Sequence, residues 1–111
     1  MDAKMILPIG KLDRQITIQS LTQTQGEYGE LIDTWADVAT VWANAYAGAG
    51  KEFVAARQVN AEVSMQFQIR WLAGVSATMR ILYDGAYFDI VSLSEVGRRE
   101  RLNIFAKARQ V

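Results

Sequence analysis

The sequence predicts an all-β fold, namely a small antiparallel β-barrel, SH3-like or similar, with a long projecting loop that contains a short helical turn. Three observations support this fold class. Apolar and polar residues alternate strictly over residues 59–71, and Asp84-Gly85 joins two β-rich runs. Five or six short strand patterns recur along a chain that holds one proline. We favour a closed barrel because closure removes unpaired strand edges.

The first strand pattern covers residues 15–21, where Ile16 and Ile18 share one face and polar residues occupy the other. Residues 26–29 have glycine at both ends and predict a turn. A second strand system follows from about residue 31 to residue 46.

Residues 47–58 interrupt the strand pattern. Gly48 and Gly50 give this segment a flexible start, and residues 51–58 contain good helix formers but are too few for an isolated helix. We therefore expect a loop with one helical turn. Long loops inside compact domains are usually functional or disordered.

The remaining strands follow in order. The alternation over residues 59–71 is typical of a half-buried antiparallel strand. Residues 79–83 and 87–93 form the two arms of a hairpin, because the Asp-Gly pair between them tolerates positive φ in a tight turn. Residues 102–108 alternate again, and the charged segment 97–101 predicts a solvent-facing turn before this last strand.

Composition limits the possible functions. A chain of 111 residues, half of them hydrophobic, predicts a single globular domain over residues 1–111. It has no cysteine and no histidine, which excludes thiolate nucleophiles, disulfides, a histidine base and the usual zinc sites. No apolar stretch approaches membrane-spanning length. We expect a soluble protein without a metal or cofactor.

Charge is balanced overall but uneven along the chain. Twelve basic and twelve acidic side chains cancel, which argues against a protein whose main task is to hold a nucleic acid backbone. Residues 1–69 hold five basic and eight acidic groups, a net of −3, and residues 70–111 hold seven and four, a net of +3. If the fold separates these groups, copies could associate head to tail, the kind of contact that builds rings. A well-mixed solvated surface is the alternative.

Four short segments carry a family resemblance. They are GKLDRQITIQ at residues 10–19, VWA at 41–43, FQIRW at 67–71 and MRILYDGAYFDI at 79–90. In this order they resemble the head-tail joining, or head-closure (connector stopper), proteins of tailed bacteriophages and prophages. The resemblance covers residues 10–106. Asp13 departs from the pattern, because a basic residue is common at that position.

The resemblance implies a structural, non-enzymatic protein of the virion that is made in the cytoplasm of the bacterial host. It implies an oligomeric ring of twelvefold symmetry under the portal or adaptor ring, formed by a chain that can be monomeric when isolated. Such a ring retains packaged DNA and provides the tail attachment surface. The implied partners are portal or adaptor proteins, tail proteins and double-stranded DNA bound non-specifically in the channel, with no membrane.

The resemblance also implies that the 47–58 segment faces the channel as a mobile gating loop. Glycines would permit its movement, basic residues would meet DNA, and Glu52 would pair with a neighbouring subunit. The candidate residues are Gly48, Gly50, Lys51, Glu52, Phe53 and Arg57.

Arg98, Arg99 and Arg101 form the densest basic cluster and are candidates for contact with DNA phosphate or an acidic partner. Glu95 and Glu100 lie among them, so a solvated hairpin tip is the alternative.

Other chemistry has weaker support. Residues 48–51 lack the spacing of a phosphate-binding loop, and Glu52 replaces its hydroxyl. Carboxylates gather near a turn at Asp84, Asp89 and Glu95, but no nucleophile and base accompany them, so we predict no enzyme. Six aromatic residues could stack on bases, although their placement on strands favours core or interface packing. These are Trp35, Trp42, Phe67, Trp71, Tyr83 and Tyr87.

Two alternatives to head closure remain. One is a neighbouring connector or tail-terminator component. The other is a small OB-like or SH3-like module that binds nucleic acid or a peptide, which a basic groove with exposed aromatics would favour.

Overall fold

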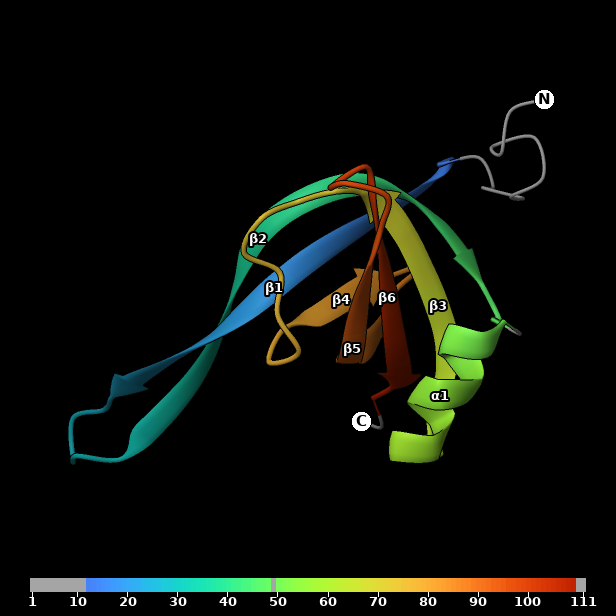
Figure 1. The fold of residues 1–111 in the computed structure, drawn as a ribbon. Coiled ribbons are helices and arrows are strands. Elements are labelled where there is room, and N and C mark those ends of the chain that lie inside the picture. Colours follow the sequence, from blue (N-terminus) through green and yellow to red (C-terminus); the bar gives the residue numbers. More distant parts are fainter. Residues whose placement is uncertain (1–11, 49, 110–111) are drawn as a thin grey trace, which may run out of the picture.

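The computed structural model describes residues 12–48 and 50–109 and contains a closed ring of six antiparallel strands with one helix outside it (Figure 1). The spatial order is β1-β2-β3-β6-β5-β4, and β4 returns to β1. The predicted all-β barrel is confirmed. Gly10 and Lys11 of the first family-like segment lie outside the described residues. The elements are β1 (Arg14–Gln25), β2 (Leu31–Tyr46), α1 (Lys51–Val59), β3 (Val63–Arg70), β4 (Arg80–Tyr83), β5 (Ala86–Val96) and β6 (Arg101–Ala108).

The ring closes through a short contact between β1 and β4. Its three residue pairs are Thr17 with Leu82, Ile18 with Ile81 and Gln19 with Arg80. Ile18 and Ile81 are both fully buried, so apolar packing and strand pairing stabilise the closure at the same place.

The main core fills the interior of the ring. Phe67 is fully buried at its centre, and its ring meets Tyr83 and Phe88 edge-on at centroid distances of 5.5 and 5.4 Å. All six strands contribute inward-facing residues. The buried members are Ile16, Ile18, Ala43, Phe67, Ile69, Ile81, Ile90, Leu102, Ile104 and Ala106.

A second, smaller cluster lies outside the ring under α1. Phe53 and Ala56 of the helix pack against Val63 and Phe105 of the barrel, with the two phenyl centroids 6.3 Å apart. The predicted helical turn is confirmed and extends to nine residues. Tertiary packing explains the extra length, because a helix this short gains its stability from a buried face and not from propensity.

The predicted start of the third strand is wrong. Val59 ends the helix, residues 60–62 turn the chain, and β3 begins at Val63. Asn60 makes this turn: its backbone N–H donates to the Ala56 carbonyl at 2.9 Å, and its side-chain Oδ1 accepts from the Glu62 N–H at 3.0 Å. These local hydrogen bonds to the asparagine stabilise a turn, and they compete with the backbone pairing that a strand at residues 60–62 would need.

The sequence predicts that the polar residues of β3 face solvent, but two of them are buried. Gln66 and Gln68 are both buried, and the Gln68 side-chain amide donates to Asn103 Oδ1 at 2.9 Å. A register shift between Val63 and Met65 turns Val63 to the outer cluster. Both faces of β3 are therefore partly covered.

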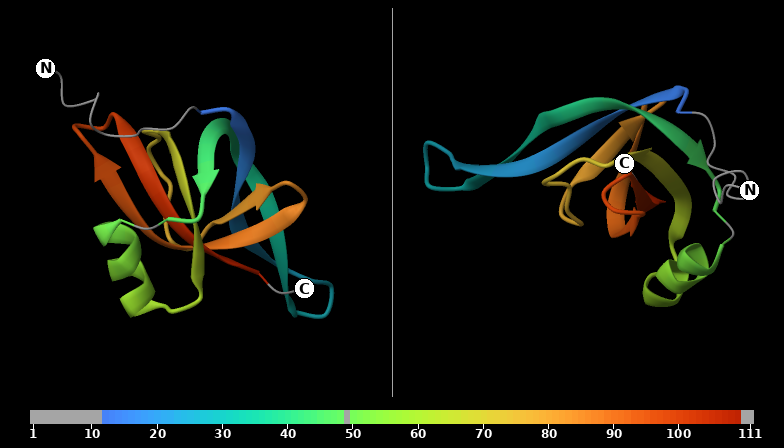
Figure 2. Two further views of the ribbon diagram at one scale, coloured as in Figure 1. Left: turned by 90° about the vertical axis from the view of Figure 1, so that its right-hand side faces the viewer. Right: turned by 45° about the horizontal axis from the view of Figure 1, so that its top comes forward.

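β1 and β2 continue beyond the ring as a two-stranded ribbon (Figures 1 and 2). β1 is longer than the predicted 15–21 segment, and past Gln19 it pairs with β2 alone. The predicted turn at the ribbon tip is confirmed: the Gly26 N–H donates to the Glu30 carbonyl at 2.7 Å, and Gly29 has φ +83°. The molecule measures 63 × 26 × 25 Å along its principal axes, and the ribbon contributes to the longest of these.

The other turns are local in origin. Asp84 and Gly85 both have positive φ, 51° and 78°, as their hairpin requires. In the turn between β5 and β6, Gly97 and Arg99 also have positive φ. Within residues 12–48 and 50–109, no helix is long and apolar enough to cross a membrane.

We predict that Phe67→Ala lowers the free energy of unfolding by about 3–5 kcal/mol, because it leaves a cavity between Tyr83 and Phe88. Urea denaturation followed by circular dichroism measures this change. Val54→Ala is the control, since Val54 is half-exposed on α1. Equal losses in the two variants would show that Phe67 is not the centre of the core.

Candidate functional site

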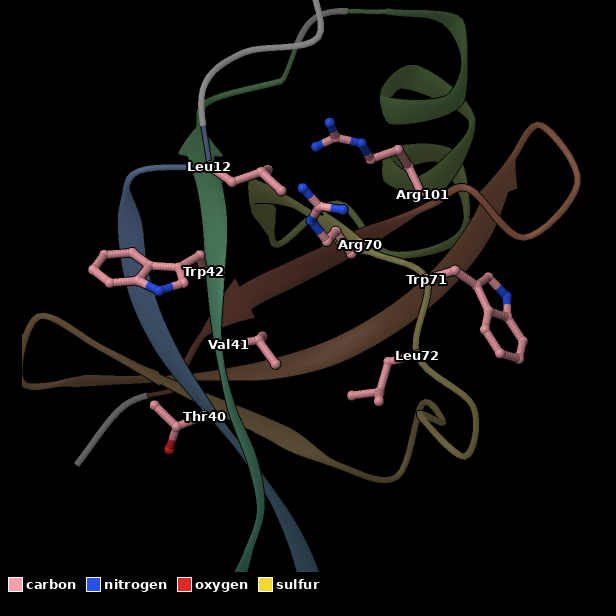
Figure 3. Close-up of a pocket in the computed structure, with 8 residues that line it drawn as sticks. All are labelled: Leu12, Thr40, Val41, Trp42, Arg70, Trp71, Leu72 and Arg101. Atoms are coloured by element: carbon pink, nitrogen blue, oxygen red, sulfur yellow. The ribbon is translucent and has the colours of Figure 1, made fainter.

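A cavity of about 660 Å³ opens where β2 leaves β3 (Figure 3). The last paired residues of these strands are Ala43 and Ile69, and beyond them β2 follows β1 into the ribbon. We call this space the arginine cavity. It is lined by Leu12, Thr40, Val41, Trp42, Arg70, Trp71, Leu72 and Arg101.

The lining separates apolar from charged groups. In Figure 3, Val41 and Leu72 extend toward each other across the middle, and the two arginines lie at one end near Leu12. Trp42 and Trp71 lie at opposite margins. The cavity therefore offers an apolar centre beside a strongly basic end.

The two arginines face each other in the sheet. Arg70 and Arg101 are direct partners in the β3–β6 ladder, an arrangement in which like charges disfavour each other. Nη1 of Arg101 is buried and has no hydrogen-bond partner among residues 12–48 and 50–109. A buried donor without an acceptor costs about 1–3 kcal/mol, so this end of the cavity favours an anionic group.

The predicted cluster Arg98, Arg99 and Arg101 is divided by the structure. Arg101 lines the cavity, whereas Arg98 and Arg99 are exposed in the adjoining turn, where the Arg99 guanidinium carbon lies 5.0 Å from the Trp71 ring centroid. Among the described residues, no ion pair joins Glu95 or Glu100 to these arginines.

Sequence analysis missed Arg70 and its place beside Arg101. The alternation over residues 59–71 identifies Arg70 only as a polar strand position, whereas Trp42 is already one of the six aromatics considered for base stacking or for packing. No local signal brings the two arginines together, because their proximity depends on the register between β3 and β6.

The predicted gating residues gather on and before α1. Phe53 is buried against the barrel, while Lys51, Glu52 and Arg57 are exposed. Burial raises the pKa of the Tyr46 hydroxyl, and the nearby Glu52 carboxylate raises that pKa further. The helix thus has one anchored face and one charged, solvent-facing side.

The two glycines of this segment differ in their surroundings. A Cβ at Gly48 would collide with the Phe53 ring and the Gln66 side chain, so close packing requires this glycine. Gly50 is the N-cap of α1 with extended backbone, and a Cβ there would meet nothing within 4 Å.

A stack of arginines and aromatic rings lies where the ribbon joins the barrel. The Arg80 guanidinium carbon is 4.1 Å from the Trp35 centroid and 3.8 Å from that of Tyr87. Arg80 Nε donates to Gln19 Oε1 at 2.7 Å, and Gln19 Nε2 donates to Asp37 Oδ1 at 2.8 Å. These contacts join both ribbon strands to the β4–β5 hairpin.

This stack accounts for two of the six aromatics considered for base stacking. Arg109 also lies over the Trp35 ring, at 5.1 Å. Phe67 and Tyr83 belong to the core, as expected, whereas Trp42 is 57% exposed. Trp42 therefore remains accessible for an intermolecular contact.

The clustered carboxylates have structural neighbours. Asp84 lies in the hairpin turn, Asp89 is 3.7 Å from Arg109 Nη1, and Glu95 is exposed. In the described part of the chain, no group of three histidine, cysteine, aspartate or glutamate residues could hold a metal ion.

Comparison with known proteins gives one family match and structural neighbours. The family model of the phage head completion protein matches residues 7–109. The solution structure of protein SF1141 from Shigella flexneri 2a is 31% identical, with a TM-score of 0.73 over 92% of this chain and 96% of that chain. A chain in the virion of a native gene transfer agent particle is 19% identical, with a TM-score of 0.60 over 90% and 97%. A search of curated protein sequences gave no significant match.

We predict that Gly48→Ala lowers the free energy of unfolding by about 1–3 kcal/mol, because the added methyl group displaces Phe53 or Gln66. Gly50→Ser is the matched control, and we expect it to be neutral or to stabilise by up to about 1 kcal/mol as a helix N-cap. Thermal unfolding of both variants measures the difference. A stable Gly48→Ala variant would show that packing does not require the glycine.

Proposed function

The chain belongs to the phage head completion protein family and is a structural component of a phage head, and from this premise we propose that it closes the filled head. Several copies form a ring under the portal or adaptor, retain the packaged DNA and present the surface to which the tail attaches. The observation that carries the proposal is the family match over residues 7–109, nearly the whole chain.

The fold suits a load-bearing ring. Closure of the sheet removes unpaired strand edges within the barrel, and the Arg80 stack links the ribbon to the barrel at several points. The molecule has two unlike surfaces: the ribbon projects from the barrel, and the arginine cavity is a recess in it. A ring built from one repeated contact needs such a complementary pair.

We assign the DNA-facing role to α1. Its exposed side carries Lys51 and Arg57, which are suited to non-specific contact with phosphate. The helix is held to the barrel by its two buried residues, Phe53 and Ala56. Gly50 at its start has open space where a side chain would stand, since a Cβ there would meet nothing within 4 Å. We assign to this glycine the hinge at which the helix shifts toward the channel.

The second candidate function is a binding module for nucleic acid or a peptide. The arginine cavity favours it, because a basic recess beside the exposed Trp42 is the feature such a module requires. The zero net charge of the chain opposes a general nucleic acid binder. A peptide-binding role is compatible with head closure, since the bound segment can belong to a neighbouring protein.

Deletion of the gene from the phage or prophage that encodes the chain tests the proposal directly. Electron microscopy of the particles should reveal separate tails and tail-less heads that have lost their DNA. Intact, infectious virions would refute head closure and leave the binding module as the better function.

We predict that Lys51→Glu combined with Arg57→Glu impairs DNA retention but not folding, because both side chains are exposed. This pair is a cleaner test than removal of the helix, which would uncover Val63 and Phe105. Nuclease sensitivity of the packaged DNA measures retention, and circular dichroism verifies the fold.

The matched control for this experiment keeps both charges, as Lys51→Arg and Arg57→Lys, and should retain DNA as the unaltered protein does. If the charge-reversed particles also retain their DNA, α1 does not face the channel and the gating role is wrong.

A further inference from the structure

We propose that the ribbon tip of one copy docks into the arginine cavity of the next copy. Tyr28 enters the apolar part of the cavity, and the Glu27 carboxylate meets Arg101 and Arg70. This inference rests on the proposed ring and specifies the contact that builds it.

The cavity defines what its occupant must contain. Its apolar lining of Val41 and Leu72 calls for an apolar or aromatic side chain, and the unpaired Nη1 of Arg101 calls for an acceptor. A carboxylate can also accept hydrogen bonds from both arginines, which relieves the like-charge contact between them. An occupant with an aromatic ring beside a carboxylate satisfies both requirements.

The ribbon tip carries this combination. Tyr28 is 91% exposed and stands directly after Glu27 in the turn, and the Glu27 side chain is exposed as well. Leu31 and Ile32 behind them are 69% and 46% exposed. Apolar side chains grouped on one projection, with nothing of the same chain covering them, mark an interaction surface.

Charge complementarity supports the same pairing. No lysine or arginine occurs between residues 15 and 50, so the ribbon contributes acidic groups alone. The barrel end around the cavity carries four arginines, Arg70 and Arg101 in the lining and Arg98 and Arg99 beside it, against two exposed glutamates, Glu95 and Glu100. The arginines therefore leave a net positive charge at this end. The uneven charge seen in the sequence is thus concentrated on two separate surfaces, which steers their encounter and fixes its direction.

The tip is also preorganised for docking. The Glu30 carboxylate accepts from the Tyr28 N–H at 3.1 Å and holds the turn, and Gln23 Nε2 donates to Asp33 Oδ1 at 3.0 Å across the ribbon. The Arg80 stack fixes the ribbon where it leaves the barrel. A rigid arm loses little conformational freedom on binding.

Docking within one copy is ruled out by distance. Val41 in the cavity lies ten positions along β2 from Leu31 at the tip, roughly 33 Å at the rise of an extended strand. The tip of a given molecule must therefore meet another molecule's cavity. A contact between unlike surfaces repeats from copy to copy and closes into a ring when its rotation allows.

Site-directed cross-linking tests the contact, and the absence of native cysteine removes the background. The chain carries Gln25→Cys beside the ribbon tip together with Trp42→Cys at the margin of the cavity. Both positions are exposed, and Tyr28 and Glu27 stay in place to make the proposed contact. Purified protein and assembled particles are treated with a short bis-maleimide reagent. We expect a ladder of cross-linked multimers from the dimer upward.

The control pairs Gln25→Cys with Ala55→Cys, which is exposed on α1. It should give at least tenfold less cross-linked product. A ladder of equal strength with the control, or no ladder in particles that contain the chain, overturns the proposed contact while leaving head closure in place. Particles that lack the chain altogether refute the proposed function instead.

A mixing experiment keeps the inference testable if the cysteine variants fold poorly. One variant carries Glu27→Lys and Tyr28→Ala at the tip, and the other carries Arg101→Glu in the cavity. Under conditions where the unaltered chain forms multimers, each variant alone should sediment as a monomer. Their equimolar mixture should stop at dimers, because one intact tip and one intact cavity remain.

Multimers of either single variant would overturn the inference. So would a cavity variant that assembles normally but loses affinity for double-stranded DNA, since DNA phosphate would then be the cavity's occupant.

Discussion

The closure of the sheet between β1 and β4 governs the rest of the architecture. Because β4 has four residues, it can hold β1 over Thr17 to Gln19 and no further. The remainder of β1 keeps β2 as its partner, and the two leave the ring together as the ribbon. As β2 departs it gives up its pairing with β3 beyond Ala43, and the arginine cavity forms in that gap. The ribbon thus follows from the shortness of β4, and the cavity from the end of β3 at Arg70.

The outside of the barrel is organised by a different contact. Phe53 and Ala56 of α1 cover Phe105 and Val63, so an otherwise marginal helix is stabilised by the sheet it protects. Close packing also explains Gly48, because a Cβ at this position would collide with Phe53 and Gln66. The helix keeps its charged residues in solvent, where the proposed contact with DNA needs them. One side of α1 thus packs on the barrel, and the opposite side carries the charges for the proposed contact with DNA.

The proposed head closure demands both strength and direction from a small protein. Strength comes from the closed sheet and from the Arg80 stack, which joins strands β1, β2, β4 and β5. The direction of assembly comes from two different surfaces: the ribbon tip is acidic and apolar, and the arginine cavity is basic. A chain with zero net charge can still be strongly polarised in this sense, because its acidic and basic groups are grouped by the fold and not by composition.

By itself, the sequence determined the features that depend on neighbouring residues. Alternation located most of the strands, and the Gly26 to Gly29 and Asp84-Gly85 turns follow from the φ angles their residues tolerate. Alternation failed at Val59, where the Asn60 turn and a packed helix outweigh it. Tertiary structure alone decided that Arg70 faces Arg101, that β1 and β2 outrun the barrel, and that Gln66 and Gln68 are buried. Each of these depends on pairing between segments far apart in the chain, and strand register leaves no signature in the local order of residues.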